Sequence, residues 1–202
     1  MNYPIYFDSK KSSHLFELND RFDFLKDLYI KNKLPNILML SGQKGLGKST
    51  LINHLLFYIF DKNNYDVKNY NFDNKSSFYN QFLSNIFSNI IYLSGSDFKN
   101  IKIEDIRNLK SKILKTTILN KPRFIIFDDV ELFNNNSLNA LLKILEEPSI
   151  NNHFVLINNL SNPLIDTIKS RCLEIKILLN EKKRQNIIKF LIEKFKIQLT
   201  ID

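Results

Sequence analysis

The chain has 202 residues, 44% of them apolar, which is enough for a full core and too many for intrinsic disorder. Its 29 basic and 21 acidic residues give a net charge of +8, which permits contact with nucleic acid, but the scattered lysines carry no functional weight. A single cysteine, Cys172, excludes an internal disulfide and a multi-cysteine zinc site, so no zinc is expected. The first residues lack the apolar stretch of a signal peptide, and the longest apolar run, residues 55–60, is too short to span a membrane. A cytoplasmic protein without membrane contact is the expectation.

Apolar runs alternate with helical patterns along the chain, which is typical of βα units and a parallel sheet. Five apolar runs are predicted to be strands, at residues 37–40, 90–93, 124–127, 154–157 and 173–177. Four helices are predicted between them, at residues 49–60, 76–87, 103–114 and 137–147. Residues 61–74 are polar and rich in turn formers, and we expect a surface excursion there. From residue 180 the pattern changes to a basic amphipathic helix at residues 181–195, so a second unit is expected to begin there.

Glycine is the informative residue of the composition, because three of the four glycines fall within six positions. They belong to a stretch that fits the phosphate-loop pattern G-x-x-x-x-G-K-[ST] in full and is followed by Thr50: Gly42, Gln43, Lys44, Gly45, Leu46, Gly47, Lys48 and Ser49. Such a loop wraps backbone N–H groups around phosphates, and the helix that follows adds its positive end. Lys48 is expected to reach the β- and γ-phosphates, and the Ser49 hydroxyl to ligate Mg²⁺. The loop predicts ATP binding with Mg²⁺; an ordinary glycine turn is the alternative.

Two aspartates follow the most apolar strand, at residues 124–127. Asp128 should lie at the carboxyl edge of the sheet, where open α/β folds bind ligands, and is predicted to hold Mg²⁺ together with Ser49. A solvated pair of turn aspartates is the alternative. Asp129 stands where ATPases of this architecture usually have a glutamate that activates water. Its carboxylate sits on the order of 1 Å further back, which can cost about 10²-fold in rate, so binding with weak or no turnover is predicted.

Four further segments carry a family resemblance: residues 103–107 (IEDIR), 127–131 (FDDVE), 139–148 (NALLKILEEP) and 167–172 (TIKSRC). With the loop, they make residues 34–177 resemble the clamp-loader branch of the AAA+ ATPases. Within that branch, the segments are similar to the delta-prime group of bacterial DNA polymerase III subunits. The resemblance implies an α/β AAA+ P-loop fold with a five-stranded parallel sheet and helices on both faces. It also implies a nucleotide-binding domain at residues 1–179 and the start of a helical lid at residues 180–202. Because the family continues through a lid and a collar, a fragment is one expectation and a different assembly is the other.

The resemblance also implies residue roles and partners. Arg171, in the Ser-Arg-Cys segment, would act in catalysis by reaching across a subunit interface to a neighbour's ATP; a surface arginine is the alternative. Asn159, or its neighbour Asn158, would sense the γ-phosphate; hydrogen bonding at the strand end is the alternative role. The implied partners are other clamp-loader subunits, the sliding clamp and, through the complex, primer–template DNA.

These patterns leave three classes of function open. The leading hypothesis is a delta-prime-like subunit that binds ATP and supplies Arg171 in clamp loading during DNA replication. An autonomous AAA+ ATPase that remodels DNA or protein is the main alternative. A nucleoside or nucleotide kinase shares the phosphate loop, but it would not explain the leucine-rich helix at residues 139–148 or the Ser-Arg-Cys segment.

Overall fold

The computed structural model describes residues 8–96, 104, 106, 108, 109, 113, 121–147 and 151–195. Five parallel strands form its main sheet, in the order β4-β5-β6-β1-β7. Their bounds are β1 Ile37–Ser41, β4 Ile90–Ser94, β5 Arg123–Asp128, β6 Asn152–Asn158 and β7 Leu173–Lys176. The predicted five-stranded parallel sheet is therefore confirmed, with each strand within two residues of its expected bounds.

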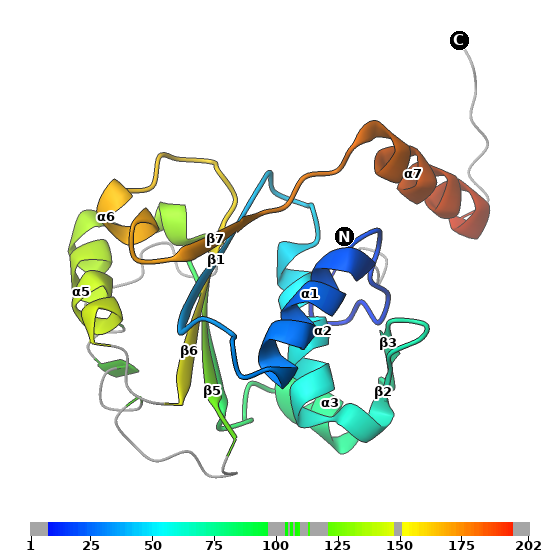
Figure 1. The fold of residues 1–202 in the computed structure, drawn as a ribbon, viewed down its shortest axis with the longest axis horizontal. Coiled ribbons are helices and arrows are strands. Elements are labelled where there is room, and N and C mark those ends of the chain that lie inside the picture. The colour runs from blue at the N-terminus through cyan, green and yellow to red at the C-terminus, as the bar shows by residue number, and fades with distance from the viewer. Residues whose placement is uncertain are drawn as a thin grey trace.

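Helices cover both faces of this sheet (Figure 1). On one face lie α1 Asn19–Ile30, α2 Lys48–Phe60 and α3 Ser77–Leu83; on the other lie α5 Asn135–Glu146 and α6 Asp166–Lys169. Alternate strand residues feed the two cores, since Leu38 and Leu40 pack toward α2 while Met39 packs toward α5. The helix predicted at residues 103–114 lies largely outside the described residues; its described members are helical, and Ile106 is buried beneath that second face.

The predicted surface excursion at residues 61–74 is more ordered than expected. It contains a short 3₁₀ turn, Lys62–Asn64, and an antiparallel pair of strands, β2 Tyr65–Asp66 and β3 Asn71–Phe72. Phe72 is buried and stacks on Phe57 of α2 with ring centroids 3.9 Å apart. This hairpin is thus a covering layer for α2, formed by aromatic residues that the polar composition of the segment conceals.

The following helix, α3, is shorter than predicted. It ends at Leu83 because the chain turns at Asn85, where φ is +54°. Asparagine is one of the few residues that tolerates this left-handed conformation. Helix α1 was not predicted from the sequence; its Phe22 and Leu25 are fully buried against the α2 side of the core.

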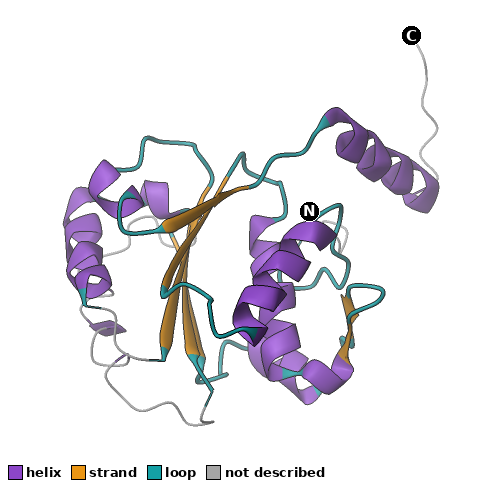
Figure 2. Cartoon of the chain, viewed as in Figure 1, coloured by secondary structure: helices purple, strands orange, loops and turns teal. Residues whose placement is uncertain are grey.

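The last helix, α7 Glu181–Phe195, has its predicted bounds and stands beyond the end of the sheet, joined to β7 by a loop (Figures 1 and 2). It packs on the N-terminal segment, which we define as residues 8–18. The Lys183 ammonium donates to the Glu17 carbonyl over 2.9 Å, and the rings of Phe190 and Phe16 lie 5.1 Å apart. That residues 180–202 begin a lid domain stays a prediction. Within the described residues, every helix falls short of the length or apolar character that crossing a bilayer requires.

Candidate functional site

A cavity of about 610 Å³ opens at the carboxyl ends of β1, β4 and β5. Ligands of open α/β sheets bind at this edge. Most of the predicted binding residues line it: Lys44, Gly45, Leu46, Gly47, Lys48, Ser49, Thr50, Asp128, Asp129 and Asn159. The opposite wall comes from the N-terminal segment and from α7, with apolar side chains such as Leu15 and Ile187. The cavity therefore combines a polar floor with a wall that is apolar in part.

The backbone of the loop explains two of its glycines. A side chain at Gly42 would collide with the backbone carbonyl of Ile177, just after β7. Gly47 has a φ of +78° and immediately precedes α2, so it lets the chain turn into the helix without the steric cost that a Cβ would add. The loop thus passes close to the neighbouring strand and directs the first turn of α2 at the cavity.

Lys48 is buried behind this loop, with 2% of its surface exposed. Its ammonium donates to the carbonyl oxygens of Gly42 and Gln43, both over 2.7 Å. Burial lowers the pKa of Lys48 to about 8, although the carboxylates of Asp128, Asp129 and Glu131 oppose this shift. The group is therefore mainly protonated at neutral pH. An ammonium carries three N–H donors, so one remains for an anion in the cavity.

Ser49 and Asp128, the two predicted magnesium ligands, are brought together. The Ser49 hydroxyl donates to Asp128 Oδ2 over 2.8 Å, and the Asp128 Oδ1 atom accepts from the Asp129 backbone N–H over 2.9 Å. Adjacent oxygens in an octahedral Mg²⁺ shell are about 3 Å apart, given Mg–O bonds of roughly 2.1 Å. The spacing and the oxygen chemistry of this pair fit Mg²⁺.

Asp128 has a further partner that the sequence did not indicate. The Tyr92 hydroxyl, from β4, hydrogen-bonds to Asp128 Oδ2, the same oxygen that accepts from Ser49. Burial and the neighbouring Asp128 carboxylate raise the pKa of Tyr92 above its ordinary value, so its hydroxyl stays protonated and acts as a donor.

Asp129 is buried at the cavity floor with a left-handed backbone, φ +50°. Its Oδ1 atom accepts from Asn159 Nδ2 over 2.7 Å and faces Lys44 Nζ at 3.4 Å. Burial would raise the pKa of Asp129, but hydrogen bonds from Ser96 and Asn159 and the charge of Lys44 together hold it below its ordinary value. The carboxylate is therefore ionised and restrained. Because the Lys44 side chain is 69% exposed, solvent screening makes the lysine contact the weakest of these.

The structure distinguishes the two candidate asparagines. Asn159 lines the cavity and contacts Asp129, whereas the Asn158 side chain is buried and accepts from the backbone N–H of Leu160 over 2.9 Å. The position of Asn159 is fixed from behind, because its backbone N–H donates to Glu131 over 3.1 Å. Asn158 thus has a local structural role, and Asn159 is the one placed to meet a ligand.

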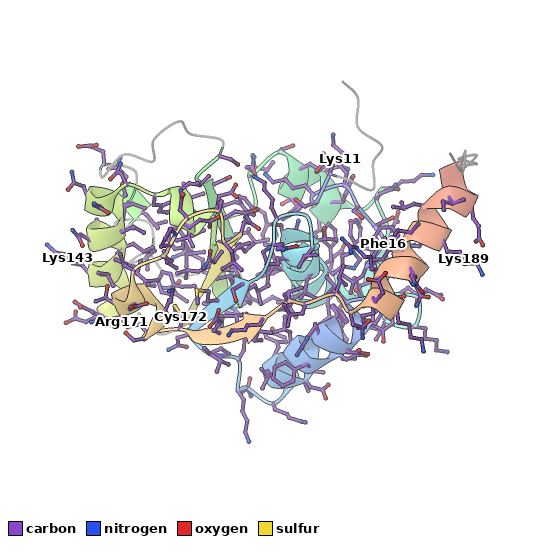
Figure 3. The ribbon with its side chains drawn as sticks, turned by 90° about the horizontal axis from the view of Figure 1, so that it is seen from above. Lys11, Phe16, Lys143, Arg171, Cys172 and Lys189 are labelled. Atoms are coloured by element: carbon purple, nitrogen blue, oxygen red, sulfur yellow. The ribbon has the colours of Figure 1, made fainter. Side chains whose placement is uncertain are left out.

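Arg171 lies apart from the cavity, where α6 leads into β7 (Figure 3). Its guanidinium donates to the Thr167 carbonyl over 2.7 Å and to Glu146 of α5 over 2.9 Å. The side chain is 35% exposed. Arg171 therefore cannot serve this chain's own cavity from this position, while its charge remains accessible at the surface.

Sequence reasoning missed the side chains that β4 and the turn after it bring to the site, Tyr92, Ser94 and Ser96. The polar residues that end this strand were an available signal, because the carboxyl ends of parallel strands share one edge. The contribution of the N-terminal segment had no comparable signal, since it depends on contacts between residues far apart in the chain.

Solved structures share this fold at low identity. A gamma subunit-related protein of DNA polymerase III from Thermotoga maritima superposes with a TM-score of 0.62 at 23% identity, over 87% of this chain and 52% of that one. The RuvB Holliday junction branch migration motor of the same organism gives 0.52 at 18% identity, over 91% and 52%. With the strand order, these likenesses show that the chain has the fold of AAA+ P-loop proteins.

The chain belongs to the family described as DNA polymerase III, delta subunit, whose profile matches residues 18–181. Among curated relatives, a DNA polymerase III delta' subunit of Buchnera aphidicola is 26% identical over 146 residues, 70% of this chain and 44% of that protein. The delta' subunit of Pseudomonas aeruginosa is 37% identical over 76 residues, 38% of this chain and 23% of that protein. This chain is thus a delta-prime-like member of the clamp-loader family, and it spans less than half the length of these two relatives.

Proposed function

We propose that this chain is an ATP-binding subunit of a DNA polymerase III clamp loader that presents Arg171 to the nucleotide site of a neighbouring subunit. The observation that carries the proposal is the distribution of charge. A complete phosphate loop meets Asp128 in one cavity, while an accessible arginine of the family's Ser-Arg-Cys segment lies apart from that cavity. Its partners would be other loader subunits, the sliding clamp and primer–template DNA.

ATP binding is supported by the groups that converge on the cavity. The third N–H of Lys48 and the start of α2 offer positive charge to phosphates. Ser49 and Asp128 would hold Mg²⁺, which supplies charge neutralisation at the phosphate oxygens when bound. The apolar wall contributed by Leu15 and Ile187 suits a nucleoside.

Weak or absent turnover follows from the state of Asp129. A general base works best when its pKa lies near the working pH. The hydrogen bonds that Asp129 accepts from Ser96 and Asn159 lower its pKa, away from the working pH. Its side chain is also shorter than the usual glutamate. In this proposal, the nucleotide of this chain serves structure or regulation, and its contribution to hydrolysis lies in a neighbour's site.

The trans role of Arg171 is supported by its surroundings. A guanidinium is permanently charged and can pair with two phosphate oxygens at once. Its present partner, Glu146, is about half exposed, so the ion pair is weak and can be exchanged for a phosphate at little cost.

The first experiment measures binding of a fluorescent ADP analogue with MgCl₂ to the wild-type chain and to Lys48→Ala. Removing a buried charge partner costs about 2 kcal/mol or more, so the variant should bind at least roughly 30-fold more weakly. Lys143→Ala, an exposed lysine on α5, is the matched control and should bind like the wild type. Equal binding by wild type and Lys48→Ala would refute the nucleotide site.

An autonomous AAA+ ATPase is distinguished from this proposal by turnover of the isolated chain. That alternative requires steady ATP hydrolysis that Asp129→Ala abolishes. Negligible hydrolysis alongside measurable binding supports the subunit role proposed here.

A further inference from the structure

We propose that Tyr92 is a positioning residue that holds Asp128 in the orientation needed for a divalent cation. The inference rests on the proposed nucleotide site and adds a residue to it. It starts from the bond between the Tyr92 hydroxyl and Asp128 Oδ2, the oxygen that also accepts from Ser49.

The sheet explains how Tyr92 reaches this carboxylate. Strands β4 and β5 are parallel neighbours, with Tyr92 opposite Ile126 and Ser94 opposite Asp128. Side chains two residues apart along a strand share a face, so Ile126 and Asp128 point to the same side. The Tyr92 ring packs against the core cluster that contains Ile126, and its length carries the hydroxyl forward to Asp128. A shorter side chain at this position could not join the core to the sheet edge.

The ring has a further contact, outside the core. Lys10, in the N-terminal segment, places its ammonium 4.8 Å from the ring centroid of Tyr92. The same ammonium donates to Asn85 over 3.1 Å, which anchors it. Tyr92 is thus held between the core and a cation, so its hydroxyl has a defined direction.

The role matters because Ser49 and Asp128 would both contact the cation. Once both residues are ligands, the hydrogen bond between Ser49 and Asp128 no longer fixes the orientation of the Asp128 carboxylate. Tyr92 comes from β4, whereas Ser49 lies on α2 and Asp128 on β5, so its hydroxyl is a third group that donates to the carboxylate. Groups that hydrogen-bond to a ligating carboxylate typically change metal affinity 10- to 100-fold when removed.

The test measures binding of the fluorescent ADP analogue by full-length wild type and Tyr92→Phe, first in EDTA and then over a MgCl₂ series. Tyr92→Phe removes a single oxygen and keeps the ring. Binding in EDTA gives each protein's own baseline without the cation, and measurable binding there also shows that the variant is folded. The MgCl₂ concentration that gives half of the affinity gain should rise roughly 10- to 100-fold.

Tyr70→Phe is the matched control, because the Tyr70 hydroxyl also donates to an aspartate, Asp23, over 2.7 Å, and neither residue lines the cavity. It should leave both measurements unchanged. An unaltered MgCl₂ dependence in Tyr92→Phe overturns the inference. A lower half-saturating MgCl₂ concentration also overturns it, because it would mean that the hydroxyl competes with the cation. If the wild type binds no nucleotide under either condition, the proposed function fails together with this inference. If wild type responds to MgCl₂ and Tyr92→Phe responds identically, only the inference fails.

Discussion

In the proposed function, Asp129 is the residue that separates nucleotide binding from turnover. It shares the cavity with Lys48 and Ser49, yet its carboxylate is engaged by Asn159 and faces Lys44. Its lowered pKa reflects donors that outweigh the effect of burial. On this proposal, two properties limit Asp129 as a base, its reach and its basicity, and substitution can separate them.

Replacing Asp129 with glutamate tests the limit set by reach. The added methylene moves the carboxylate on the order of 1 Å toward the ligand, so Asp129→Glu should raise ATP turnover by the isolated chain by up to about 10²-fold. Steady-state phosphate release is the measurement. Asp129→Asn, with the same length and no charge, should give no gain. If Asp129→Glu hydrolyses ATP no faster than the wild type, reach is not what limits turnover.

At the scale of elements, the N-terminal segment is tied to α2, the helix that follows the phosphate loop. Asn53 donates to the Ser9 carbonyl over 2.8 Å, and the ring of His54 contacts the Ser12 carbonyl and the Tyr65 hydroxyl. His54 has no exposed surface, and burial lowers its pKa from 6.5 to about 4. Neutral His54 therefore joins α2, the β2–β3 hairpin and one wall of the cavity.

This junction predicts a loss of stability in acid. Because the folded pKa of His54 lies below the unfolded value, its contribution is complete above pH 6.5 and is lost as the pH falls through 4. The loss is on the order of 3 kcal/mol in the free energy of unfolding. Urea unfolding at pH 7 and pH 4 measures it, and His54→Gln, which cannot titrate, should lose correspondingly less. Equal losses in both proteins would contradict the assignment.

The elements that could be predicted are those whose signal is local. The loop at residues 42–49 and the strand at residues 124–127 are recognisable from neighbouring residues alone, and α7 has its expected bounds. The positions of Tyr65, Tyr92 and the N-terminal segment could not be predicted in this way. Each depends on a partner between 11 and 44 positions away in the chain, such as His54, Asp128 or Asn53, and no local periodicity encodes such pairings.

At the scale of the whole molecule, the cavity and Arg171 lie in different places. The cavity opens between the sheet edge, the N-terminal segment and α7, whereas Arg171 lies beside α5 and α6 on the far side of the sheet (Figures 1 and 3). In the proposed function, the chain receives a nucleotide at one surface and offers a cation at another. This separation is what a subunit acting on its neighbour requires.

The most direct test of this account measures ATP hydrolysis by a clamp-loader complex reconstituted with wild type or Arg171→Ala. Arg184→Ala, an exposed arginine on α7, is the matched control. An arginine supplied in trans is worth roughly 10³-fold or more at the site that it reaches. We predict that a complex with Arg171→Ala loses the part of its ATP hydrolysis that takes place at the site Arg171 reaches. Nucleotide binding by the isolated Arg171→Ala chain, and hydrolysis by a complex with Arg184→Ala, should stay at wild-type levels. Unchanged hydrolysis in an assembled Arg171→Ala complex would contradict the account.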